Sequence, residues 1–136
     1  MTFERSTESD SLPTSFTALS IVYPHGTSIA RGTKTIEVRS WLPPQVPIRN
    51  LLIVENRVFL SETLQEDPDG RAVAIVDVIE VHPWRQDEVK SACSRGWQPG
   101  YFSWVLENVR PLPGMDIIPA RRKLYSVLFP QGLHHL

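Results

Sequence analysis

The feature that most constrains this chain is its alternation of short β-forming runs with turns rich in proline and glycine. The longest run covers residues 71–81, where Val and Ile occupy most positions, and β-branched residues favour strands. It follows Asp67-Pro68-Asp69-Gly70, a sequence typical of a tight turn. The 12 prolines and 7 glycines separate the other runs in the same way. This pattern predicts a small, mostly β barrel rather than alternating β-α-β units.

We expect about six short strands with one or two short helices. A helix is predicted over residues 25–31, closed by a glycine, and a mostly polar one over residues 85–93. Residues 1–15, rich in Ser, Thr and acidic residues, are expected to form a flexible tail. Residues 16–130 are expected to form one domain, followed by a C-terminal tail over 131–136. The strands are expected at 16–22, 34–41, 51–54, 71–81, 101–109 and 124–129.

Charge and cysteine content limit the classes of function. The formal net charge is -1, which argues against strong non-specific binding of duplex nucleic acid. The run Arg121-Arg122-Lys123 forms either a local basic wall or a solvated turn. Cys93 is the only cysteine, so a disulfide within the chain and a cysteine-based zinc site are excluded. We expect no metal and no cofactor.

Apolar runs and the N-terminus bear on localisation. No apolar run approaches membrane-spanning length, and the N-terminus lacks a basic segment followed by an apolar one. We therefore expect a cytoplasmic protein without membrane contact.

One segment combines charged and aromatic side chains in alternating order. It reads Gly-Thr-Lys-Thr-Ile-Glu-Val-Arg-Ser-Trp and ends at Trp41. In a strand, Ile36 and Val38 share one face. Glu37, Arg39 and Trp41 share the other. The residues alone allow either a solvated face with an ion pair of little energetic value or a site for an anionic or polar planar ligand.

This segment also carries a family resemblance. Gly32, Lys34, Glu37 and Arg39 match the G-x-K-x-x-E-x-R signature of the ASCH domain family, a branch of the PUA-like superfamily. The order of apolar runs resembles that family's strands as well, over roughly residues 17–129. The resemblance implies a PUA-like pseudobarrel with a helix between the first two strands. It also implies a cleft beside the signature that binds RNA or modified nucleosides.

The candidate ligand-binding residues come from the signature and from nearby aromatic side chains. Lys34 and Arg39 are expected to meet phosphate groups or base edges, although Arg39 could instead only hold Glu37 in place. Tryptophan is a common stacking platform for nucleobases, whereas Trp104, between alternating apolar neighbours, is expected in the core. The candidates are Tyr23, Lys34, Thr35, Glu37, Arg39, Trp41, Trp84 and Trp97.

We therefore predict a small domain that binds RNA or a nucleoside in a cleft lined by the signature, with duplex DNA disfavoured. One alternative is a metal-independent ribonuclease with Lys34, Glu37 and Arg39 as catalytic candidates. A second alternative, implied by the resemblance, is an amidohydrolase that acts on acylated cytidine. In the ASCH amidohydrolases a threonine stands three residues after the signature lysine. Glu37 occupies that position here, so the nucleophile is missing. A third interpretation is an accessory module that contacts another protein.

Overall fold

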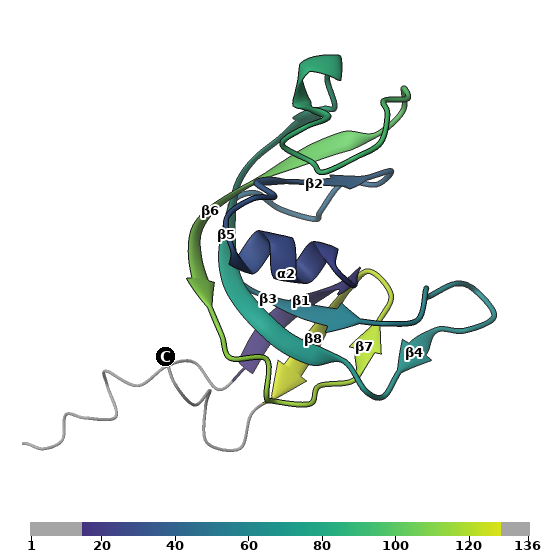
Figure 1. Ribbon diagram of the computed structural model, residues 1–136, viewed down its shortest axis with the longest axis vertical. Helices are drawn as coiled ribbons and strands as arrows, with labels where there is room; N and C mark the ends of the chain where they lie inside the picture. Colours follow the sequence, from purple (N-terminus) through teal and green to yellow (C-terminus); the bar gives the residue numbers. More distant parts are fainter. Residues whose placement is uncertain (1–14, 129–136) are drawn as a thin grey trace, which may run out of the picture.

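A six-stranded, strongly curled sheet wraps around a short helix (Figure 1). The computed structural model describes residues 15–128. Neighbouring strands follow the order β2-β6-β5-β3-β1-β8, and β4 pairs with β7 in a separate ribbon. Only β1 and β3 are parallel among these pairs. The elements are β1 (Ser15–Val22), α2 (His25–Ala30), β2 (Ile36–Arg39), β3 (Ile48–Asn56), β4 (Glu66–Asp67), β5 (Arg71–Pro83), the 3-10 helix η1 (Gln86–Glu88), β6 (Phe102–Pro111), β7 (Ala120–Arg121) and β8 (Leu124–Leu128).

This arrangement confirms the predicted mostly β pseudobarrel with a helix between the first two strands. The predicted strands are present, and the third is longer than expected because it begins at Ile48, directly after the proline-rich loop. The predicted tails lie outside the described residues, apart from Ser15, which begins β1. The domain limits of 16–130 therefore stay a prediction.

Helical structure within residues 15–128 is limited to short segments. The helix predicted over 85–93 is wrong, because only the three-residue η1 forms there and turns follow it. Val89 and Ala92 of that segment pack with Trp84 in a third apolar cluster through turns, and the buried Glu88 side chain accepts a hydrogen bond from Ser103 on β6. No helix in the described part of the chain has the length and apolar character needed to cross a bilayer.

Strand β5 bends because its pairing shifts register against both neighbours. The buried carboxylate of Asp77 lies at one such shift. It accepts the backbone N–H of Asn50 at 3.0 Å, Asn108 Nδ2 at 3.1 Å and the Arg110 guanidinium at 2.8 Å. Burial raises the pKa of Asp77, but these contacts outweigh burial and the net pKa is lowered. The carboxylate thus satisfies backbone and side-chain groups that regular pairing leaves without partners.

Two apolar clusters occupy the two faces of the sheet. Alternation along β3 places Leu51 and Ile53 in the first cluster and Leu52 and Val54 in the second. The first cluster also contains Ile29, so helix α2 packs inside the curl of the sheet (Figure 1). Trp104 lies fully buried in the same cluster, which confirms its predicted place in the core.

Gly70 lies where the turn before β5 meets a neighbouring segment too closely for a side chain. A Cβ there would lie 2.4 Å from the Ile118 carbonyl oxygen and 2.8 Å from Val54 Cγ1. We expect Gly70→Ala to lower the free energy of unfolding by about 1–3 kcal/mol in urea denaturation, because the backbone must shift. Gly96→Ala is the matched control, since a Cβ there meets nothing within 4 Å. Equal stability of the two variants would contradict this packing.

Candidate functional site

A cleft of about 1140 Å³ opens beside the signature strand β2. Its walls come from regions far apart in the chain: residues 20–25, residues 34–41, the loop 92–101 after η1, and residues 121–123, which comprise the end of β7 and the turn before β8. The end of β3 and the loop that follows it contribute Asn56, Phe59 and Leu60. The fold therefore brings the signature together with segments that sequence analysis did not connect to it.

The end of α2 directs the chain from the helix into this cleft. Gly32 has φ of 82°, a left-handed conformation that glycine adopts without strain. Its N–H donates to the Ile29 carbonyl at 3.0 Å, and the N–H of Thr33 donates to the Ser28 carbonyl at 3.0 Å. These two bonds define a Schellman cap. The sharp turn brings Lys34 to the cleft, where it is 5% exposed.

Glu37 is a buried anion held between two cations. Its Oε1 lies 3.5 Å from Lys34 Nζ, and its Oε2 lies 2.7 Å from Arg39 Nε. Lys34 Nζ also donates to the Ala92 carbonyl at 2.5 Å, and Arg39 donates to the Ser20 carbonyl at 2.9 Å. The signature side chains thus form one connected set, in which Arg39 does hold Glu37 in place.

Cationic side chains outnumber carboxylates in the lining of the cleft. Among the described residues, six cations and one carboxylate, that of Glu37, line it. The run 121–123, for which the sequence left two interpretations open, supplies three of the six and therefore forms a basic wall. The six cations are Lys34, Arg39, Arg95, Arg121, Arg122 and Lys123.

These cations differ in how far protein groups neutralise them. Two of them share the Glu37 carboxylate, and Arg121 Nε lies 3.1 Å from Glu66 Oε2. Arg95, Arg122 and Lys123 form no ion pair within residues 15–128. These three exposed side chains are the ones available to an anionic ligand.

Two of the predicted aromatic residues, Trp41 and Trp84, line the cleft. Trp41 is partly exposed and packs edge-to-face against Trp104, with ring centroids 5.0 Å apart. Lys123 Nζ lies 5.5 Å from the centre of the Trp41 ring, which joins the basic turn to the signature wall. Trp84 is only 6% exposed, so its ring offers little surface to a ligand.

The other predicted ligand-binding residues, Tyr23, Thr35 and Trp97, are not among the side chains that line the cleft. Tyr23 is exposed and stacks with Arg57, whose guanidinium carbon lies 4.2 Å from the ring centre. Thr35 is exposed on the strand entrance. Trp97 Nε1 donates to the Trp84 carbonyl at 2.9 Å. In this structure Trp97 therefore secures the loop after η1.

Sequence analysis missed several side chains that line the cleft, among them Phe59, Arg95 and Tyr101. Phe59 lies in the segment 57–65, which carries no periodic apolar pattern. Arg95 and Tyr101 flank a turn whose direction depends on packing elsewhere. The alternation of residues 101–109 predicted a strand. It did not show which face of that strand would lie beside the signature residues.

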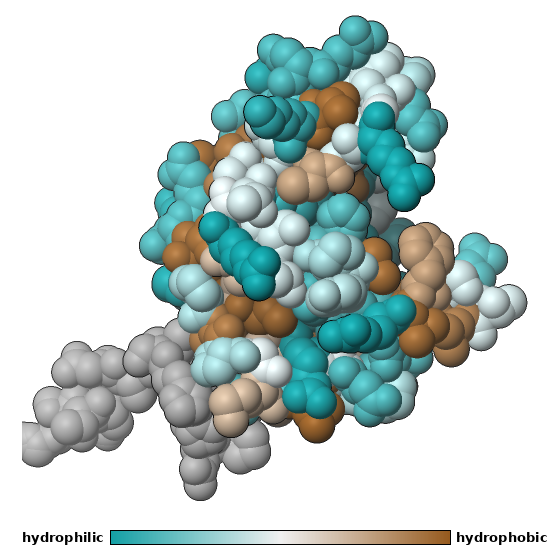
Figure 2. Space-filling model, in the orientation of Figure 1, coloured by the Kyte–Doolittle hydropathy of each residue, from teal (hydrophilic) through white to brown (hydrophobic). Residues whose placement is uncertain are grey.

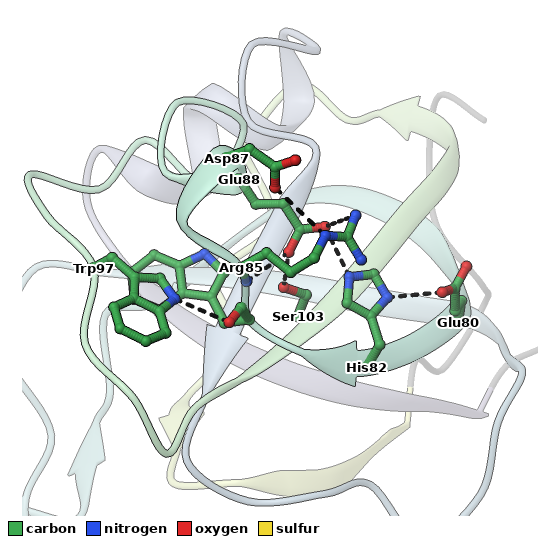
Figure 3. Close-up of polar contacts among 8 residues, drawn as sticks. Glu80, His82, Arg85, Asp87, Glu88, Trp97 and Ser103 are labelled. Atoms are coloured by element: carbon green, nitrogen blue, oxygen red, sulfur yellow. Dashed lines mark hydrogen bonds and ion pairs between the residues drawn. The ribbon is translucent and has the colours of Figure 1, made fainter.

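A second polar cluster joins η1 to β5 and β6 (Figure 3). Glu88 is buried at its centre. Its Oε1 accepts Ser103 Oγ at 2.7 Å and the Arg85 backbone N–H at 3.1 Å, and its Oε2 lies 2.7 Å from His82 Nε2. His82 Nδ1 lies 2.7 Å from Glu80 Oε2. The cluster therefore fixes the start of the loop that forms one wall of the cleft.

Burial and hydrogen bonding act in opposite directions on this cluster. Burial raises the pKa of Glu88, but hydrogen bonds from Ser103 and His82 outweigh burial and lower it below its usual range. For His82 the signs are reversed: burial lowers the pKa of the imidazole, but the Glu88 and Glu80 carboxylates outweigh burial and raise that pKa overall. The histidine and Glu88 therefore stabilise each other's charged forms.

Chemically, the cleft offers fixed positive charge beside aromatic surface. Both oxygens of its one carboxylate already contact cations. Within residues 15–128, no three or more His, Cys, Asp or Glu side chains are grouped so that they could hold a metal ion. The groups in the cleft suit an anionic ligand that carries flat, aromatic parts.

Comparisons with known proteins identify the family. The family model of the ASCH domain matches residues 19–114. An ASCH crystal structure from Zymomonas mobilis is 13% identical, covers 70% of this chain and 68% of that chain, and has a TM-score of 0.45. A tyrosine-to-phenylalanine variant from the same organism is 12% identical, covers 74% of each chain, and also has a TM-score of 0.45. A search of curated proteins finds no match.

Glu37→Gln and Lys34→Met should differ in their effect on stability. The first leaves two cations without their counter-charge, whereas the second keeps the pair between Glu37 and Arg39. We expect Glu37→Gln to lower the free energy of unfolding by about 3–5 kcal/mol, and Lys34→Met to lower it by less. Urea denaturation measures both. A larger loss for Lys34→Met would show that Glu37 is not the common counter-charge.

His82→Gln should destabilise the protein in a pH-dependent way. Because folding raises the pKa of His82 above 6.5, its contribution is complete below that pH and is lost as pH rises through the raised value. Folding lowers the pKa of Glu88 below 4.5, so its contribution is complete above that pH and is lost at lower pH. We expect the stability difference between wild type and His82→Gln to be largest between these two values and to shrink in alkali.

Urea denaturation at about pH 5.5 and about pH 9 measures this difference. The control is His25→Gln, because His25 forms no ion pair within the described residues. A stability loss in His82→Gln that is equal at both pH values would refute the charged pair.

Proposed function

Because this chain belongs to the ASCH domain family, in which the cleft beside the signature is thought to bind RNA or modified nucleosides, we propose that it binds single-stranded RNA along its basic cleft. The observation that carries the proposal is a contrast in charge. The whole chain has a net charge of -1, yet among residues 15–128 six cations and one carboxylate line the cleft. Cations gathered in one hollow create a local positive potential that attracts a polyanion.

The cations of the cleft fall into two groups with different proposed roles. Lys34 and Arg39 are tied to Glu37 and to backbone carbonyls, so they give the signature wall a fixed geometry. Arg95, Arg122 and Lys123 are exposed and would meet phosphates. Arg95 comes from the loop after η1, whereas the other two come from the turn before β8. A ligand with several phosphates can therefore engage both walls.

The shape and lining of the cleft favour single strands over duplexes. A duplex hides the faces of its bases, whereas an unpaired strand presents them to aromatic side chains. Trp41 and Tyr101 supply partly exposed aromatic surface in the cleft. A free nucleoside would leave the three exposed cations without phosphate partners. An oligonucleotide therefore uses more of the site than either alternative.

The geometry bears on the enzymatic alternatives as well. A ribonuclease needs a group that takes a proton from the ribose hydroxyl, and Glu37 already contacts Lys34 and Arg39. This favours a positioning role for Glu37 over that of a general base. Incubating the protein with labelled RNA in EDTA tests the alternative. Cleavage that disappears in Glu37→Gln, while that variant stays folded, would replace binding with ribonuclease activity as the function.

The protein-interaction alternative has its own test. Affinity capture from a nuclease-treated extract would recover the same protein partner from wild type and from Arg122→Ala if the cleft has no part in that contact. Loss of all captured protein after nuclease treatment supports the RNA proposal.

The salt dependence of binding tests the proposed phosphate contacts. For single strands, log K falls with log salt by about 0.7 per phosphate contact, so three exposed cations predict a slope of about -2. Fluorescence anisotropy with a labelled single-stranded RNA oligomer measures this slope. We expect Arg95→Ala and Arg122→Ala each to reduce its magnitude by about 0.7.

Arg71→Ala is the control for these measurements, because Arg71 is exposed on β5 and does not line the cleft. It should leave both the affinity and the slope unchanged. Absence of binding at low salt, or equal losses in all three arginine variants, would contradict the proposal.

A further inference from the structure

One large apolar side chain at the cleft, that of Phe59, is mostly exposed. Phe59 has the largest exposed fraction, 76%, among the exposed large apolar side chains of residues 15–128, and it lines the cleft. Exposed aromatic rings are common at binding sites, because a ligand can cover them at little cost in side-chain entropy. We propose that Phe59 stacks on an unpaired base of RNA held in the basic cleft. This inference rests on the proposed function and names a specificity-determining residue for it.

The backbone around Phe59 is held by contacts on both sides. Asn56 Nδ2 donates to the Val58 carbonyl, and the Arg57 backbone N–H donates to Asp67 at 3.2 Å. On the other side, Leu60 packs against the second apolar cluster. These contacts hold the loop on both sides of Phe59. An anchored backbone reduces the loop ordering that binding of a base would require.

The surroundings of Phe59 match a nucleotide better than a purely apolar partner. Figure 2 shows apolar side chains gathered over the loop between β3 and β4, with strongly hydrophilic side chains beside them. The same cleft contains the basic turn 121–123. A base stacked on Phe59 would thus have cations in the same cleft for its phosphates. This combination of aromatic platform and cationic groove is typical of single-strand binding.

Stacking on Phe59 would select unpaired nucleotides. In a duplex the base faces are covered by neighbouring bases, so the ring would have nothing to contact. A phosphate polymer without bases would meet the cations alone. The ring and the cations therefore make separable contributions, and an oligomer that lacks its bases distinguishes them.

The experiment compares the affinities of wild type, Phe59→Ala and Phe59→Trp for three probes, measured by fluorescence anisotropy. The probes are a single-stranded RNA oligomer, an abasic oligomer of equal length, and duplex RNA. We expect Phe59→Ala to weaken single-strand binding by roughly 5- to 150-fold and to leave the salt slope unchanged. It should not alter binding of the abasic or duplex probe. Phe59→Trp should retain single-strand affinity.

Met115→Ala is the matched control, because Met115 is 67% exposed and does not line the cleft. If wild type binds the RNA and Phe59→Ala binds it equally well, the stacking inference fails and the proposed function stands. An equal loss on the abasic probe also overturns stacking. If wild type binds no RNA, both fail. Circular dichroism confirms that each variant is folded.

Discussion

The buried carboxylate of Glu37 is the interaction on which the site depends. Through Lys34 and Arg39 it connects the turn after α2, strand β2, the Ala92 carbonyl and the first strand. Each cation loses water when it is buried, and the shared anion together with two backbone carbonyls compensates for that loss. The signature is thus first a structural device. It fixes one wall of the cleft, and other parts of the chain add the exposed cations Arg95, Arg122 and Lys123.

The fold could be predicted largely from sequence because its strands are marked locally. Runs of Val and Ile predicted β5, and Gly32 marked the end of α2. The false helix over 85–93 shows the limit of local patterns. In that segment Glu88 forms hydrogen bonds with Ser103 on β6 and with His82 on β5. No local pattern reports such a partner.

The site could be predicted only in part, for the same reason. Alternation along the signature strand placed Glu37, Arg39 and Trp41 together, and all three line the cleft. Trp84 was a candidate stacking platform, yet its ring packs against Trp97 and Tyr101. Net charge says nothing about where charges gather, because it averages over surfaces that the fold separates. A polyanion meets the local potential of the cleft rather than the total.

The pairing of β8 with β1 has a consequence for how the cleft is assembled. The two strands come from opposite ends of the described chain, and the turn 121–123 immediately precedes β8. During synthesis this turn emerges after every other wall of the cleft, and contacts of such long sequence separation form slowly. A fragment that ends before residue 121 contains the whole signature but lacks three of the six cations that line the cleft. Such a fragment would match the signature, but of the six cations it would keep only Lys34, Arg39 and Arg95.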